Sequence, residues 1–81
     1  MIKFHLKFYG EIAEVMGASE QTISVNETSF SANELKEELC LRSEKLKTIP
    51  FKIAVNNALV DSNTSLTNND TISLLPPFAG G

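Results

Sequence analysis

Residues 2–9 read Ile-Lys-Phe-His-Leu-Lys-Phe-Tyr, and this alternation of apolar and polar side chains decides the fold class. Successive side chains of a β-strand point to opposite faces, so a period of two predicts a strand with one buried face. His5 falls on the polar face and is the single histidine of the chain, which favours a solvated surface residue over a ligand or base. The chain therefore opens with a half-buried strand.

The segments that follow predict a turn and a second strand. Gly10 breaks the first strand, residues 11–16 can form a short helical turn, and Gly17 can close it. Residues 21–25 alternate again and are close enough in sequence to pair antiparallel with the first strand.

A capping box marks the start of the main helix. Residues 31–34 read Ser-Ala-Asn-Glu, which has the S-x-x-E form, and Phe30 precedes them as one half of a hydrophobic staple. The apolar stripe at helical spacing is Ala32, Leu35, Leu39 and Leu46. Arg42 interrupts this stripe, which predicts an irregular end to the helix. Cys40 lies off the centre of the stripe, and we expect it to pack as an unreactive thiol.

The second half of the chain predicts three more strands. After Pro50, residues 51–55 alternate into a strand, and residues 58–60 return as a short one beyond an Asn-Asn turn. A turn over 68–70 precedes a last strand over 71–75. The expected inward residues are Leu66, Ile72 and Leu74, and the expected outward ones are Thr71, Ser73 and Leu75. One helix across one face of a mixed sheet, with the last strand beside the first, is an α+β, β-grasp (ubiquitin-like) fold.

Composition fits one small domain. The chain has 81 residues, 42% of them hydrophobic, and a formal net charge of −3, which argues against a nucleic-acid partner. One cysteine excludes an internal disulfide, a Cys-only zinc site and an iron–sulfur cluster. The alternating N-terminus predicts no signal peptide or membrane span, so we expect a cytoplasmic protein without membrane contact, bound metal or bound cofactor.

The chain ends in an unusual tail, Pro76-Pro77-Phe78-Ala79-Gly80-Gly81. Two prolines favour an extended path, and the five residues from Pro77 reach at most ~17 Å. From Thr71 onward no side chain is charged, so the α-carboxylate of Gly81 is the one ionised group. We interpret residues 1–75 as a scaffold and residues 76–81 as a tail that presents this carboxylate to a narrow channel. The alternative is a flexible end of no function.

Four apolar residues lack an expected place in the core: Tyr9, Leu59, Leu75 and Phe78. Exposed apolar clusters on small proteins often mark docking sites, so these residues are the predicted partner surface. Leu75 is the predicted anchor because it is the last outward residue before the tail.

The segments 55–60, 66–72 and 74–81 together resemble the small subunit of molybdopterin synthase, and the likeness extends over the whole chain. One departure is Asn69-Asp70, where that family usually has a Gly-Asp turn. The resemblance implies a sulfur carrier that is not itself catalytic. An activating enzyme would consume ATP to adenylate Gly81, and a sulfur donor would convert it to a thiocarboxylate. The large subunit would then receive the tail and supply the catalytic side chains that pass the sulfur to a pterin precursor.

Three other classes of protein remain open. A sulfur carrier for thiamine synthesis would share the fold and the Gly-Gly end. A ubiquitin-like modifier would attach the same activated glycine to lysine amines. A binding module that is never activated would tolerate deletion of the tail.

Overall fold

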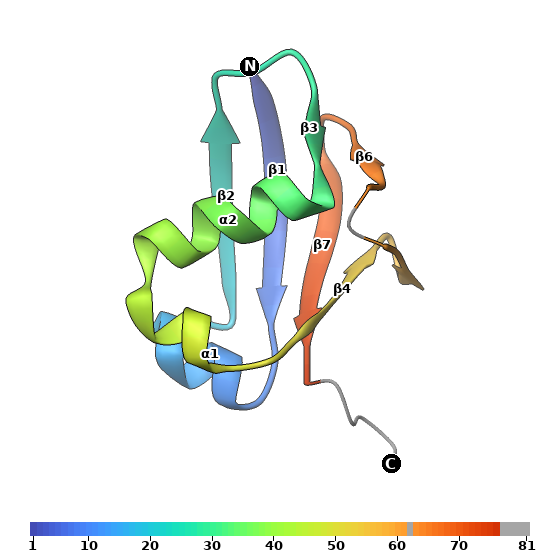
Figure 1. Cartoon of the computed structure of the whole chain (residues 1–81). Helices are drawn as coiled ribbons and strands as arrows, with labels where there is room; N and C mark the ends of the chain where they lie inside the picture. The colour runs from blue at the N-terminus through green and yellow to red at the C-terminus, as the bar shows by residue number, and fades with distance from the viewer. Residues whose placement is uncertain (62, 77–81) are drawn as a thin grey trace.

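The computed structural model describes residues 1–61 and 63–76. Along this part of the chain the elements are β1 (Ile2–Phe8), α1 (Glu11–Met16), β2 (Glu20–Val25), β3 (Phe30–Ser31), α2 (Ala32–Arg42), the 3₁₀ helix η1 (Glu44–Thr48), β4 (Lys52–Val55), β5 (Ala58–Leu59), β6 (Ser65–Leu66) and β7 (Asp70–Leu75). Helix α2 crosses one face of the sheet, and α1 lies at the end of the sheet from which β7 leaves (Figure 1).

The main sheet has the order β2-β1-β7-β4-β5. Strand β1 pairs antiparallel with β2 and parallel with β7, and β4 pairs antiparallel with both β7 and β5. The last strand therefore lies beside the first at the centre of the sheet. This is the β-grasp arrangement that the order of elements predicts, and the prediction of fold is confirmed.

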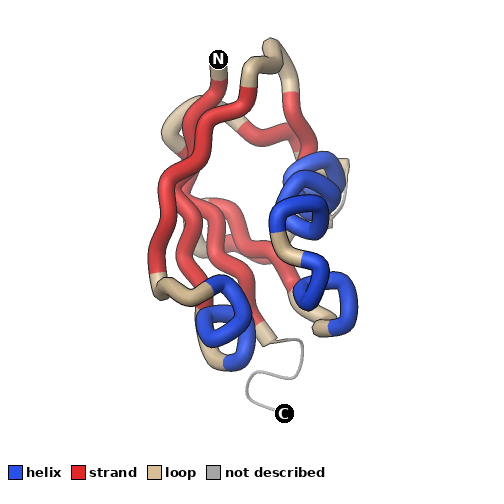
Figure 2. The backbone as a smooth tube through the Cα atoms, turned by 90° about the vertical axis from the view of Figure 1, so that its left-hand side faces the viewer, coloured by secondary structure: helices blue, strands red, loops and turns tan. Residues whose placement is uncertain are grey.

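The alternation in the first strand is confirmed residue by residue. Along β1 every even-numbered residue is buried and every odd-numbered one is exposed. The parallel register places Phe4, Leu6 and Phe8 opposite residues of β7 that are also buried. Two central strands thus direct the same face towards α2, and the tube in Figure 2 shows the sheet and the helix as two layers.

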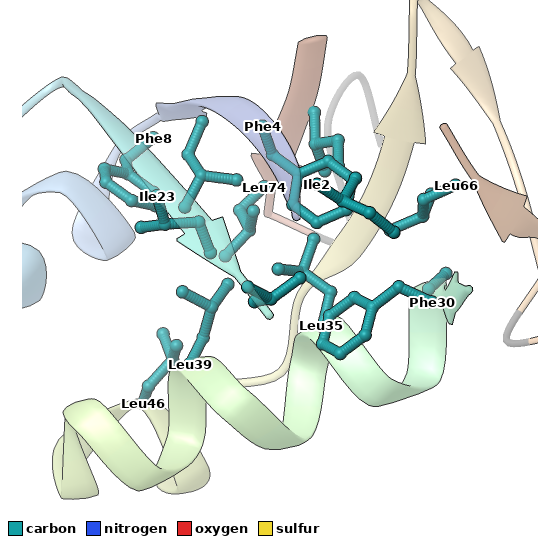
Figure 3. Packing of buried hydrophobic residues seen from close by; sticks show 14 of the residues in the cluster. Ile2, Phe4, Phe8, Ile23, Phe30, Leu35, Leu39, Leu46, Leu66 and Leu74 are labelled. Atoms are coloured by element: carbon teal, nitrogen blue, oxygen red, sulfur yellow. The ribbon is translucent and has the colours of Figure 1, made fainter. Parts of the chain in front are cut away.

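Helix α2 completes the core from the other side. Ser31 caps it: the Ser31 hydroxyl accepts from the Glu34 N–H at 3.2 Å, and the Glu34 carboxylate accepts from the Ser31 N–H at 3.0 Å. Leu35 and Leu39 are fully buried beneath the sheet (Figure 3). The rings of Phe4 and Phe30 stack 5.8 Å apart. Truncating a leucine as buried as Leu39 to alanine typically costs ~2–5 kcal/mol.

The structure corrects two details of the sequence interpretation. Helix α2 ends at Arg42, so Leu46 reaches the core from η1 and not from the helical stripe. Phe30 and Leu66 lie on β3 and β6, which form a separate two-stranded sheet. Two-residue strands have no periodicity, so the sequence pattern does not reveal them.

Asparagines make the two tight turns. Asn56, Asn57 and Asn69 all have positive φ, which asparagine tolerates better than most residues. The replacement of the usual Gly-Asp turn by Asn69-Asp70 therefore leaves the left-handed turn in place. No helix in the described part of the chain is long and apolar enough to cross a membrane.

Candidate functional site

The candidate site begins where β7 ends and the tail leaves the sheet. Strand β7 is the middle strand of five, and its last residues are held on both sides. Leu74 is opposite Phe8 of β1 and Ile53 of β4, and Leu75 is opposite Lys52. The origin of the tail is thus fixed by two neighbouring strands.

Gly10 forms the seat of the first tail residue, Pro76. A Cβ placed on Gly10 would lie 3.5 Å from Cγ of Pro76, which is an ordinary contact distance. Gly10 has φ 58° and ψ −133°, a conformation that residues with a side chain rarely adopt. Its carbonyl oxygen accepts from the Ala13 N–H at 3.1 Å and so starts α1. The sequence marked Gly10 only as a strand breaker, because nothing local links it to residue 76.

The structure partly groups the predicted partner residues. Tyr9 directly follows Phe8 of β1, and Leu75 directly follows Leu74 of β7, its partner in the register, so both lie beside the tail root. Tyr9 is exposed and Leu75 is half-buried. Phe78, like Pro77, Ala79, Gly80 and Gly81, lies outside the described residues.

Leu59 lies apart from this pair. It is on β5, and β4 separates it from β7. The register places Leu59 opposite Ala54, which is in turn opposite Ser73, so Leu59 belongs to the outward face of the sheet. Its side chain is 62% exposed, far more than that of half-buried Leu75. The predicted partner surface is therefore divided. Tyr9 and Leu75 lie beside the tail root, and Leu59 lies on β5 with β4 between them.

The other end of β7 carries a polar network. The carboxylate of buried Asp70 accepts from the Thr67 N–H at 2.8 Å, the Thr67 hydroxyl at 2.9 Å and the Asn56 amide at 3.1 Å. Burial raises the pKa of Asp70, but the hydrogen bonds from Thr67 and Asn56 outweigh it and hold the pKa below its ordinary value. Each donor has its acceptor, so this network has a structural role.

The remaining candidates for chemistry are isolated. Cys40 is a half-buried free thiol on α2, and His5 is exposed with Nδ1 3.4 Å from the Thr22 hydroxyl. Among the described residues no three His, Cys, Asp or Glu side chains are grouped closely enough to hold a metal ion.

Two solved structures are similar to this chain at 25% identity or more. The chain is similar to a putative molybdopterin converting factor subunit 1 from Pyrococcus furiosus, with 25% identity and a TM-score of 0.88 over 95% of this chain and 99% of that one. It is 32% identical to a chain in a complex of subunits 1 and 2 of molybdopterin-converting factor from Helicobacter pylori, with a TM-score of 0.67 and coverage of 99% and 100%.

A third structure shares the fold at lower identity. The small archaeal modifier protein 1 from Methanosarcina acetivorans is 21% identical, with a TM-score of 0.80 over all of this chain and 98% of that one. The family model described as the ThiS family matches residues 6–81, which is nearly the whole sequence. The chain therefore belongs to the ThiS family.

Proposed function

We propose that this chain is the sulfur-carrying small subunit of a molybdopterin synthase, and that the carboxylate of Gly81 carries the sulfur. The 32% identity over the full length to a chain from the complex of subunits 1 and 2 is the observation that most supports this pathway. The fixed root of the tail supports the presentation of a terminal group. The domain of residues 1–75 would act as the scaffold and residues 76–81 as the inserted segment.

The chemistry starts with a poor electrophile. A carboxylate does not accept a nucleophile readily, so the activating enzyme uses ATP to join the Gly81 carboxylate to AMP and releases pyrophosphate. A sulfur donor then displaces AMP, which takes one carboxylate oxygen with it. The product is a thiocarboxylate, in which one oxygen of Gly81 has been replaced by sulfur.

The second half-reaction takes place in a large subunit. The side chains of the tail are uncharged, and its one charge is the Gly81 carboxylate. The tail can therefore enter a protein channel without removing a charged side chain from water. The large subunit supplies the catalytic side chains that move the sulfur to a pterin precursor. The carrier returns as a carboxylate and is charged again, so it acts as a co-substrate.

A protein modifier is the second candidate function, favoured by the shared fold of the small archaeal modifier protein 1. There the same adenylated glycine would acylate a lysine amine instead of taking up sulfur. A sulfur carrier for thiamine synthesis would form the same thiocarboxylate but deliver it to a different acceptor.

Mass spectrometry of the intact protein, produced alone and together with candidate activating enzymes, separates these functions. The proposal expects the mass gain of one sulfur for one oxygen, dependent on ATP, and then loss of that gain when large subunit and pterin precursor are added. Lysine-linked conjugates in place of the sulfur form would establish the modifier. A loaded carrier that the large subunit fails to discharge would refute the pathway.

A further inference from the structure

A groove runs along the β4–β5 edge of the sheet, between that edge and the first turns of α2. It has a volume of about 460 Å³. Its lining includes Lys36 of α2, Phe51 just before β4, Lys52 at the start of β4, and Leu59, Val60 and Asp61 from β5 onward. This volume lies within the range that is typical of ligand-binding pockets in proteins. Strand β4 separates β5, on which Leu59 lies, from β7 and the tail root.

The wall of the groove is apolar. Phe51 and Val60 are half-buried and pack against the core, while Leu59 stands 62% exposed at the edge. Phe51 and Val60 offer apolar surface on the groove side of this edge, and Leu59 offers it on the outward side. Among the described residues, the Lys36 side chain lies over the Phe51 ring, and Leu59 stays exposed.

The charges around this wall favour an anion. The Lys36 ammonium lies 5.4 Å from the ring centroid of Phe51, and Lys52 supplies a second cation. Within the described residues neither lysine forms an ion pair. The carboxylate of Asp61 is already engaged, because its Oδ1 accepts from the Asn63 N–H at 2.9 Å and the Thr64 hydroxyl at 3.3 Å.

The edge itself favours an extended ligand. Strand β5 is the last strand of the sheet, so one side of its backbone faces no other strand in the described part of the chain. An extended peptide can pair with such an edge, and pockets for its alternate side chains then give specificity. Side chains on one face of that peptide would lie in the groove against Phe51 and Val60, with a carboxylate near Lys36. Side chains on its other face would lie against Leu59 on the outward face of the sheet.

We propose that this groove binds an extended segment of a partner protein in which apolar side chains stand next to Asp or Glu. Lys52 borders both this groove and the tail root, but the apolar wall of the groove is on other residues, and it holds a partner by its own contacts. It therefore goes beyond the proposed function, and it stands whichever acceptor receives the activated glycine.

A phage-displayed library of random heptapeptides, selected on the full-length protein, tests the chemistry of the occupant. The expected sequences combine apolar residues with at least one carboxylate. Synthetic copies with blocked ends, titrated into ¹⁵N-labelled protein, should shift the amides of Lys36, Phe51 and Leu59. Enrichment of peptides without carboxylates, shifts confined to the tail root, or no enrichment at all would each overturn the proposal. Selection of sequences like the chain's own Pro-Phe-Ala-Gly-Gly end would also overturn it, by making the tail the occupant.

Two pairs of matched variants locate the site. Leu59→Ser should weaken peptide binding ~10-fold or more, while Leu41→Ser, which removes an exposed leucine on α2 outside the groove, should leave it unchanged. Lys36→Glu should abolish binding of acidic peptides, while Lys45→Glu on η1 should not. All four positions are exposed, so the variants should stay folded, and unfolding curves verify this. Equal effects within either pair would contradict the assignment.

Discussion

Strand β7 is held in two different ways at its two ends. At its start, the Asp70 carboxylate accepts three hydrogen bonds from Thr67 and Asn56. At its finish, Leu75 and Pro76 meet Lys52 of β4 and the bare backbone of Gly10. Directed polar bonds fix which residue lies opposite which, whereas apolar contacts fix position with less dependence on angle. The start of β7 therefore sets the register, and its finish sets the point from which the tail leaves.

The largest expected effect is at the end of the tail. Deleting Gly81, or fusing residues after it, should abolish sulfur loading, because the adenylated carboxylate is displaced or blocked. Stability should not change, since the described sheet ends at Leu75 and the buried apolar residues end at Leu74. Intact mass and urea unfolding of the same samples measure both quantities. A tagged protein that is still loaded would refute the role of the terminal carboxylate.

The opposite result is expected at the start of β7. Asp70→Asn places an amide NH₂ where the carboxylate accepts from donors, so one donor group loses its acceptor. Such a loss costs ~1–3 kcal/mol of unfolding free energy, and each 1 kcal/mol lowers Tm by about 4–8 °C in a domain of this size. Loading per folded molecule should persist. Asp61→Asn, in an exposed loop, is the matched control and should change Tm much less.

The Asp70→Asn variant also tests how the stability of the protein depends on pH. The pKa of Asp70 in the folded protein lies below its ordinary value of about 3.9, so the charged form is favoured by folding. Its stabilisation is complete above that ordinary value and is lost as pH falls through the lower folded-state pKa. The difference in stability between wild type and Asp70→Asn should stay constant from neutral pH to about pH 5 and shrink in stronger acid. A difference that grows in acid would contradict this origin.

A smaller effect is expected for docking beside the tail root. Leu75→Glu should weaken binding to the large subunit ~30-fold, the cost of about 2 kcal/mol for a central anchor. Thr71→Glu lies on the same strand and face but at the far end, so it should change binding little. Calorimetry with each variant measures the difference. Equal losses would show that the whole outward face docks, and no loss would remove Leu75 as the anchor.

The sequence predicted the fold well because its signals were local. The alternation in β1, the Ser31–Glu34 box and the asparagine turns each depend on neighbouring residues, and all are present in the structure. The contacts that position the site join residues far apart in sequence. Gly10 meets Pro76, and Asn56 meets Asp70, and no spacing in a single sequence reveals such pairs. The position of Leu59 at a separate groove was missed for the same reason.

Two glycines at the ends of one short helix allow a test of the contact at the tail root. Gly10 and Gly17 flank α1 and both have positive φ, but only Gly10 faces Pro76. Gly17 has left-handed helical backbone angles, and alanine in that conformation lowers the free energy of unfolding by ~1 kcal/mol. Gly10 has ψ −133°, where a side chain is less tolerated, so Gly10→Ala should cost more, ~1–3 kcal/mol. Urea unfolding ranks the two, and the reverse order would contradict the assigned geometry.

The smallest expected effect distinguishes the two atoms that can carry sulfur. Cys40 is half-buried on α2, whereas the tail leaves from the end of β7. Helix α2 and strand β7 meet in the core and nowhere else in the described part of the chain. Cys40→Ser keeps the size of the side chain and replaces the thiol with a hydroxyl. Because the residue is half-exposed, water can hydrate this hydroxyl, so the free energy of unfolding should fall by less than ~1 kcal/mol. The mass gain on loading should be unchanged, because the sulfur bonds to the carbonyl carbon of Gly81. A folded Cys40→Ser protein that no longer gains sulfur would make the thiol the carrier, and the end of β7 from which the tail leaves would then have no part in sulfur loading.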